Sequence, residues 1–266
     1  MSHRSSHRRI GAAVLLGFMI VAASALRLTA EAAQPGRDAD IKIGIIGTGR
    51  IGGTLARLWA NAGYSLMISS RHPGELKGLA KSLGARVRVG TPRAAAGFGD
   101  VILISVPYRA LPQIGKDLSH ELSGKVVIDT GNPYPERDGD MALEARRLGT
   151  GVASARYLPG VRLVRAFNAI SYKDLGAQGH RAGEAYAIPL AGDDPQALAI
   201  AGRLVKAAGF DPVVVGGLDR AREFDVGTPP YVKLLTAAQL RQQLHLAPAA
   251  PTGTVAPAGT HPLPHP

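Results

Sequence analysis

Two kinds of apolar segment take turns along most of this chain. The run from Asp100 to Val106 is apolar at nearly every position, as expected for a strand that is covered on both faces of a sheet. The stretch from Pro195 to Ala208 instead has apolar residues three or four positions apart, which is the pattern of an amphipathic helix. Runs of the first kind predict strands at residues 41–46, 64–69, 87–89, 100–106, 126–129, 161–167, 185–191 and 211–215.

Helices are predicted between these strands. The periodic stretches lie just after residue 52 and at residues 74–83, 91–98, 109–119, 142–148, 151–159, 195–208 and 232–244. An alternation of strands and helices is typical of an α/β protein with a largely parallel sheet. We therefore predict a Rossmann-type, doubly wound domain that spans residues 41–245 as a single compact unit.

A glycine-rich turn joins the first predicted strand to the first predicted helix. Its sequence is Gly47-Thr48-Gly49-Arg50-Ile51-Gly52. The first glycine permits a tight turn, and the second leaves room for a pyrophosphate. The third lets the helix lie close to the strand, and the helix N-terminus directs N–H groups at the phosphates. Because the motif stands between a strand and a helix, it predicts a dinucleotide-binding site.

The end of the second predicted strand indicates which dinucleotide is bound. NAD-preferring sites place a carboxylate there, which accepts a hydrogen bond from the ribose 2′-hydroxyl. This chain has Ser70 and Arg71, which suit a 2′-phosphate through charge-assisted hydrogen bonds. The alternative is a solvated arginine in a turn. His72 is either a second neighbour of the 2′-phosphate or a solvated residue. We predict that the cofactor is NADP.

Two further strands end at the same edge of the predicted sheet. The strand at residues 100–106 stops at Pro107, where strand pairing must end. The strand at residues 126–129 leads into a turn that contains Asn132, whose backbone is held extended by the following proline. Asn132 either presents its amide to the nicotinamide or ribose or belongs to an ordinary Asn-Pro turn.

Composition narrows the classes of function. The chain has 266 residues and no cysteine, which excludes disulfides, thiolate metal sites and a cysteine nucleophile. Its formal net charge of +11 suits an anionic ligand such as a phosphorylated cofactor, or is a general surface charge. No basic helix with interleaved aromatic residues indicates nucleic-acid binding. No catalytic triad or metal site is evident, since most histidines lie near the two ends of the sequence.

The two ends of the sequence differ from the predicted domain. Residues 1–33 combine a basic start, an apolar stretch and the small-residue segment Ala30-Glu31-Ala32, which predicts a cleaved export signal. The adjacent Arg8 and Arg9 point to the twin-arginine route, and an uncleaved membrane anchor at residues 10–26 is the alternative. Residues 34–40 are read as a linker. Residues 246–266 are rich in Pro and Ala, which predicts a disordered tail.

Several motifs together resemble one family. They stand in the expected order and are the glycine-rich turn, Ser69-Ser70-Arg71, Val106-Pro107, Asn132-Pro133, Arg165-Ala166-Phe167-Asn168, Leu190-Ala191-Gly192-Asp193-Asp194 and Leu218-Asp219-Arg220-Ala221-Arg222. In residues 41–225 the chain resembles the NADP oxidoreductases that use coenzyme F-420, an 8-hydroxy-5-deazaflavin. It is also similar to the NADPH-binding module of membrane ferric reductases.

The resemblance implies hydride transfer between NADP(H) and a flavin-like small-molecule acceptor, with two cofactors held face to face. It places residues 47–52 at the pyrophosphate, Ser70 and Arg71 at the 2′-phosphate, and Val106 and Pro107 at the ribose and nicotinamide. Asn132 and Asn168 are polar neighbours. A homodimer is compatible with the resemblance.

Three functions are therefore compatible with the sequence. The first is an exported NADPH-dependent oxidoreductase with a flavin or deazaflavin acceptor. The second is a reductase of a metal chelate or a quinone. The third is a non-catalytic NADP-binding scaffold or sensor. Hydride donation to an acceptor separates these functions, whereas NADPH binding alone does not.

Overall fold

The structure is a computed structural model that describes residues 41–248 of the chain. The predicted export signal (1–33), the linker (34–40) and residues 249–266 of the predicted tail lie outside the described residues. Leu246, at the start of the predicted tail, packs against a hydrophobic cluster of the domain. The folded part of the chain therefore continues slightly beyond the predicted boundary at residue 245.

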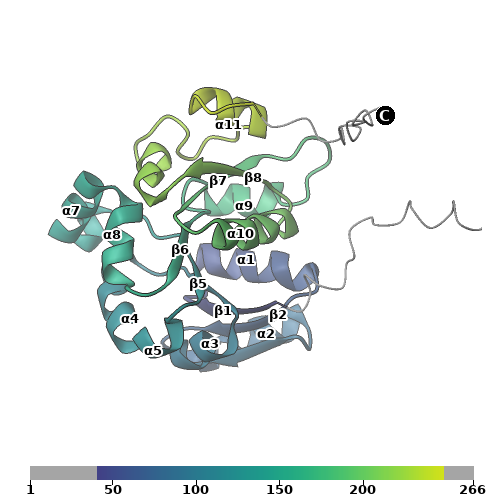
Figure 1. The fold of residues 1–266 in the computed structure, drawn as a ribbon. Coiled ribbons are helices and arrows are strands. Elements are labelled where there is room, and N and C mark those ends of the chain that lie inside the picture. Colours follow the sequence, from purple (N-terminus) through teal and green to yellow (C-terminus); the bar gives the residue numbers. More distant parts are fainter. Residues whose placement is uncertain (1–40, 249–266) are drawn as a thin grey trace, which may run out of the picture. The chain divides into compact units, whose positions relative to one another are not determined.

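Eight strands form one sheet in the order β3-β2-β1-β4-β5-β6-β7-β8 (Figure 1). Neighbouring strands are parallel except β6 and β7, which are antiparallel. The order reverses between β1 and β4, and ligands bind doubly wound sheets at this switch point. This sheet confirms the predicted Rossmann-type fold. The strands are β1 Lys42–Ile46, β2 Ser65–Ser69, β3 Val87–Gly90, β4 Val101–Ile104, β5 Val126–Asp129, β6 Arg162–Arg165, β7 Ala187–Gly192 and β8 Asp211–Gly216.

Helices cover both faces of the sheet. The α-helices are α1 Arg50–Asn61, α2 Lys77–Leu83, α3 Pro92–Phe98, α4 Leu111–Asp117, α5 Ser119–Leu122, α6 Pro135–Asp138, α7 Asp140–Leu148, α8 Thr150–Tyr157, α9 Tyr172–Gln178, α10 Pro195–Ala207 and α11 Ala237–Gln243. The 3-10 helices are η1 Pro73–Leu76, η2 Tyr108–Ala110 and η3 Leu218–Phe224.

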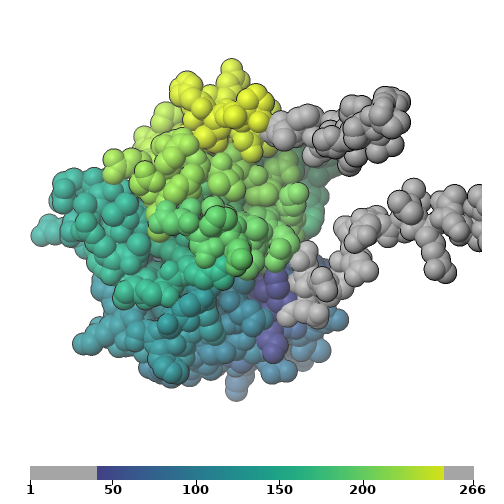
Figure 2. Space-filling view, viewed as in Figure 1, coloured from purple at the N-terminus to yellow at the C-terminus, as the bar shows by residue number. Residues whose placement is uncertain are grey.

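The core is divided by the sheet into clusters on its two faces. On one face, α1, α2, α9 and α10 pack against the strands, and the indole N–H of Trp59 in α1 donates to the Leu204 carbonyl in α10 at 2.8 Å. On the other face, α3, α4, α5, α7 and α8 form a second cluster. A third cluster joins β7 and β8 to η3 and α11. Figure 2 shows one face of the described residues, on which the side chains of neighbouring segments form a continuous surface.

All eight predicted strands agree with the structure to within two residues at each end, and two of them end two residues early. β4 ends at Ile104 rather than Val106, and β6 ends at Arg165 rather than Phe167. Phe167 has a φ of 60°, which is incompatible with an extended strand. The one-turn helix α6 and the helix α9 lie outside the predicted helix ranges.

The predicted closing helix at residues 232–244 is wrong over its first five residues. Val232 has a φ of 53°, and its N–H donates to the carbonyl of Ala169 at 2.8 Å. The Leu235 carbonyl accepts from the N–H of Ala187 in β7 at 2.7 Å. These contacts hold the segment beside the sheet, so the helix begins only after Thr236, which forms a capping box with Gln239.

Candidate functional site

The glycine-rich turn has the geometry that its sequence predicts. Gly47 has a φ of +93°, and an added Cβ would lie 2.3 Å from the Ser105 carbonyl oxygen, so this position requires glycine. The N–H of Gly47 and the hydroxyl of Thr48 both donate to the Ser69 carbonyl, at 3.1 and 3.0 Å. The turn is therefore tied to the end of β2. The Thr48 hydroxyl therefore stabilises the turn itself.

The other two glycines of the motif have different surroundings. An added Cβ at Gly49 would meet no atom within 4 Å, so the space above the N-terminus of α1 is open. An added Cβ at Gly52 would lie 2.1 Å from the Gly47 carbonyl oxygen. Gly52 thus lets α1 pack directly on the turn, and Gly49 leaves open space at the N-terminus of α1, which the predicted pyrophosphate site requires.

The predicted 2′-phosphate residues lie next to this turn. Ser70 and Arg71 directly follow β2, and the Ser70 hydroxyl accepts the N–H of His72 at 3.0 Å. Arg71 and His72 are exposed. The guanidinium of Arg71 is therefore accessible to an anion at the end of β2. Ser70 and Arg71 do not line the cleft at the carboxyl ends of the central strands.

Replacing Arg71 with Asp is expected to shift the preference from NADP towards NAD. The change removes a cation and adds repulsion, so NADP affinity should fall by about 2–4 kcal/mol. Titration of the full chain with NADPH and NADH measures this difference. Arg86→Asp is the matched control, because Arg86 is also exposed, on the loop before β3, where it donates to the Gly63 carbonyl. Equal NADPH affinity in Arg71→Asp and the wild type would contradict the assignment.

A cleft of about 500 Å³ lies beside the turn, at the carboxyl ends of the central strands. It brings together six of the predicted site residues, which are Arg50, Ile51, Val106, Pro107, Asn132 and Asn168. Residues from the loop after β6 and from the segment before α11 complete its wall. The sequence motifs that are far apart in the chain therefore converge on one site.

Two side-chain oxygens in this cleft are buried without a hydrogen-bond partner. The amide N–H of Asn132 donates to the Asn168 carbonyl at 2.8 Å, and the amide N–H of Asn168 donates to the Phe224 carbonyl at 3.5 Å. Since each NH₂ group must face a carbonyl, each Oδ1 is left as an acceptor, and neither Oδ1 has a partner. A buried acceptor without a partner is costly, so both atoms are suited to a ligand that carries N–H or O–H donors.

Cations and aromatic rings dominate the rest of the cleft. The guanidinium of Arg50 lies 4.7 Å from the centre of the Tyr172 ring, and that of Arg137 lies 5.1 Å from the Tyr134 ring. The hydroxyls of Tyr134 and Tyr231 are 2.6 Å apart, and burial together with this hydrogen bond raises the pKa of Tyr231 above its ordinary value. The residues that line the cleft include no carboxylate and no histidine. The site is therefore neutral to cationic.

Beneath the cleft lies a buried ion-pair network. The Arg165 guanidinium donates to the Asp129 carboxylate at 2.7 Å and to the Gly131 carbonyl at 2.7 Å, and it lies 3.9 Å from the Asp225 carboxylate. Burial lowers the pKa of Arg165, but the two carboxylates outweigh it and raise that pKa above its ordinary value. The second Asp129 oxygen accepts the Gly131 N–H at 2.8 Å. Both backbone groups of Gly131, which precedes Asn132, are thus held by this pair.

Arg165 belongs to one of the family motifs, but its role in this network was not predicted from the sequence. Asp129 and Arg165 are the last residues of two neighbouring strands, β5 and β6, and they pair in the sheet register. In a sequence, an acidic and a basic residue at the carboxyl ends of two successive buried strands indicate a buried ion pair. The third member, Asp225, follows η3 and is bonded to Thr150, so only the tertiary structure reveals it.

No helix within residues 41–248 is long and apolar enough to span a membrane. Within the same described range, no three residues among His, Asp and Glu are grouped closely enough to hold a metal ion. The described site thus consists of a glycine-rich turn at the N-terminus of α1, an exposed arginine after β2 and a cleft with two unpartnered acceptors. Together with the sheet order, these features define a Rossmann-type NADP-binding domain.

Comparison with known proteins shows which proteins the chain is similar to. Residues 42–133 match the family described as NADP oxidoreductase coenzyme F420-dependent. The chain is 29% identical over 216 residues to the F420-dependent NADP reductase of Methanothermobacter marburgensis, which covers 76% of this chain and 95% of the relative. It is 31% identical over 188 residues to the metalloreductase STEAP3 of Rattus norvegicus, which covers 69% of this chain. The match covers only 36% of the length of the rat protein.

A solved structure agrees with these matches. The crystal structure of a hypothetical protein from Sinorhizobium meliloti superposes with a TM-score of 0.64 and is 28% identical, covering 74% of this chain and 95% of that one. The resemblance predicted from the motifs is confirmed, and the chain is similar to NADP oxidoreductases of the coenzyme F420-dependent family.

Proposed function

We propose that this protein transfers hydride between NADP(H) and a planar, flavin-like acceptor of the deazaflavin type. The observation that carries the proposal is the cleft beside the phosphate-binding turn, with its two unpartnered amide oxygens and no acidic or imidazole side chain in its lining. A hydride transfer between two bound cofactors depends mainly on their positions and needs few acid or base groups from the protein. A cleft with this lining suits that reaction.

Different residues of the chain bind different parts of the cofactor. The open space at Gly49 and the N–H groups of α1 receive the pyrophosphate. Ser70 and Arg71 bind the 2′-phosphate, and Val106 and Pro107 form an apolar surface for the nicotinamide. NADPH, when bound, supplies the hydride. This distribution leaves the tyrosine-rich side of the cleft for the acceptor.

Asn132 and Asn168 then orient the reacting groups. Their free oxygens accept hydrogen bonds from donors such as a carboxamide NH₂ or a ring N–H. Because Asn132 is itself bonded to the Asn168 carbonyl, the two acceptors are held at a defined separation. The chain therefore orients the nicotinamide and the acceptor. The residues that line the cleft include no carboxylate or imidazole that could act as a general acid or base.

An anaerobic assay of NADPH oxidation tests the proposal. We expect rapid oxidation with a deazaflavin acceptor and a clear loss of rate in the Asn132→Ala, Asn168→Ala double variant. Asn61→Ala is the control, because Asn61 is exposed at the end of α1, away from the cleft. Binding of NADPH without oxidation by any acceptor would contradict catalysis and favour an NADP-binding scaffold or sensor.

A metal chelate or a quinone is the second candidate acceptor. The 31% identity to a metalloreductase favours it, and the two arginines of the cleft suit an anionic chelate. The same assay separates the candidates when a ferric chelate, a quinone and a deazaflavin are compared at equal concentration. Faster turnover with the chelate or the quinone would overturn the deazaflavin proposal and leave the NADPH site unaffected.

The protein is further proposed to be exported, on the basis of the basic start, the apolar stretch and the small-residue segment of residues 1–33. Secreted or periplasmic material is expected to begin near Ala33, and mass spectrometry of the purified chain measures this directly. The control replaces Arg8 and Arg9 with Lys, which should retain the precursor if the twin-arginine route is used. An intact N-terminus in soluble cytoplasmic protein would rule out the signal.

A further inference from the structure

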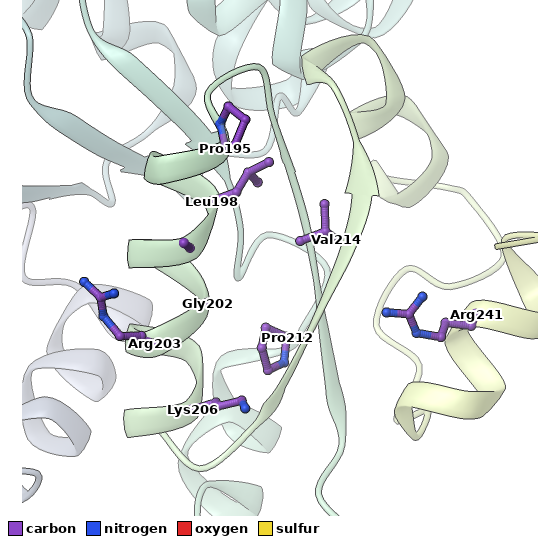
Figure 3. Close-up of a pocket in the computed structure, with 9 residues that line it drawn as sticks. Pro195, Leu198, Gly202, Arg203, Lys206, Pro212, Val214 and Arg241 are labelled. Carbon is purple, nitrogen blue, oxygen red and sulfur yellow. The ribbon is translucent and has the colours of Figure 1, made fainter. Parts of the chain in front are cut away.

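A surface hollow lies beside β8, the edge strand of the sheet, away from the switch point between β1 and β4. It has a volume of about 520 Å³ and lies between α10 and β8, with Arg241 of α11 at its side (Figure 3). Its apolar lining includes Leu198, Pro212 and Val214, and Val214 is 44% exposed. It shares no lining residue with the cleft at the switch point. The hollow is therefore a separate feature of the surface.

The strand beside this hollow has an open edge. β8 is the last strand in the sheet order of the described residues. The N–H of Asp211 donates to the Tyr186 carbonyl at 2.9 Å, so the backbone groups of Asp211 face β7. Since backbone direction alternates along a strand, those of Pro212 and Val214 face outward. Pro212 has no N–H, so it leaves no unpaired donor at this edge. Val214 has both an N–H and a carbonyl that can bond to an added strand.

Cations flank this open edge. Figure 3 shows Lys206 on α10 and Arg241 on α11, on either side of β8. A guanidinium N–H of Arg241 donates to the Ala247 carbonyl at 3.0 Å, which orients the side chain, while its buried Nε has no partner. No acidic residue lines the hollow. The lining of the hollow is therefore cationic and attracts negative charge.

We infer that the β8 edge binds an extended acidic segment of another protein by strand addition. Main-chain bonds to Val214 place the segment, one of its apolar side chains fills the space over Leu198 and Pro212, and its carboxylates meet Lys206 and Arg241. Strand addition with pockets for alternate side chains is a general mode of peptide recognition. Here the cations favour an acidic sequence.

Charge distinguishes this partner from other occupants. A second copy of the chain, paired through the same edge, would bring Lys206 and Arg241 of both copies together, which is repulsive. Residues 249–266 contain no Asp or Glu, and residues 1–40 contain more arginine than acidic residues. The segments of this chain outside the structure therefore lack the charge that the edge attracts.

Fluorescence anisotropy with the full chain tests the inference. The probe is a labelled, end-capped peptide that alternates valine with glutamate, and its matched control replaces each glutamate with lysine. We expect the acidic probe to bind and the basic one not to bind. The double variant Lys206→Glu, Arg241→Glu should weaken binding by roughly tenfold, because two attractions become repulsions. NADPH binding, measured in parallel, should be unchanged.

Backbone pairing is tested on the probe, so that the protein need not be altered. N-methylation of alternate residues removes the donors of one edge of the peptide and leaves its charge intact, and methylation of the edge that pairs with Val214 should abolish binding. Equal binding after methylation of either edge would overturn strand addition. Absence of binding by the acidic probe, or insensitivity to the charge-reversed double variant, would overturn the site. Dimerisation that Val214→Arg abolishes would assign the edge to a second copy.

Discussion

Gly49→Val is expected to abolish NADPH binding while the fold is retained. A Cβ at this position meets no protein atom within 4 Å, and the backbone is extended with a negative φ of −83°, so the cost to folding is small. The added methyl groups occupy the space that the pyrophosphate needs at the N-terminus of α1. We expect NADPH affinity to fall at least 100-fold, which corresponds to about 2.7 kcal/mol. Calorimetric titration and thermal melting of the same preparation measure the two effects.

The neighbouring glycines provide the controls. Gly53→Ala should bind NADPH normally, since a Cβ there would make only ordinary contacts with Thr48 at 3.8 and 3.9 Å. Gly52→Val should instead lower stability by about 3 kcal/mol and weaken binding as well, because its Cβ would lie 2.1 Å from the Gly47 carbonyl oxygen. If Gly49→Val bound NADPH like the wild type, the turn would be structural only and the proposed NADPH chemistry would fail.

Arg165→Met is expected to lower the free energy of unfolding by about 3–5 kcal/mol. The substitution leaves the buried Asp129 carboxylate without its counter-ion and removes the donor to the Gly131 carbonyl. Removal of one partner of a buried pair is far more costly than loss of the pair as a whole. Chemical denaturation, followed by circular dichroism, measures the loss. NADPH affinity should fall in parallel, because Gly131 positions the adjacent Asn132.

Arg162→Met is the matched control at the other end of the same strand. Arg162 pairs with Asp194 in a partly exposed ion pair, and such pairs contribute about 1 kcal/mol or less. Adding Asp129→Asn to Arg165→Met should recover part of the lost stability by removing the uncompensated charge. A loss of stability in Arg165→Met no greater than in Arg162→Met would show that the buried network does not stabilise the domain.

Local sequence was sufficient for the order of elements and for the phosphate-binding turn. Buried parallel strands are apolar at nearly every position, and amphipathic helices have a clear period, so both could be read from short windows. The turn was predictable for the same reason, because the positive φ of Gly47 and the close approach of Gly52 to the Gly47 carbonyl both arise within one strand-turn-helix unit. The Ser70-Arg71 position likewise follows from its place after the second strand.

The direction of β7, the start of α11 and the composition of the cleft were decided by tertiary structure. Nothing near Val232 in the sequence shows that its N–H will bond to Ala169 and keep the segment out of a helix. The hydroxyl pair of Tyr134 and Tyr231 joins residues 97 positions apart. The network around Arg165 needs Asp225, which η3 brings beneath the cleft. Such contacts depend on how the elements pack, and local periodicity carries no information about them, since it reports only which face of each element is buried.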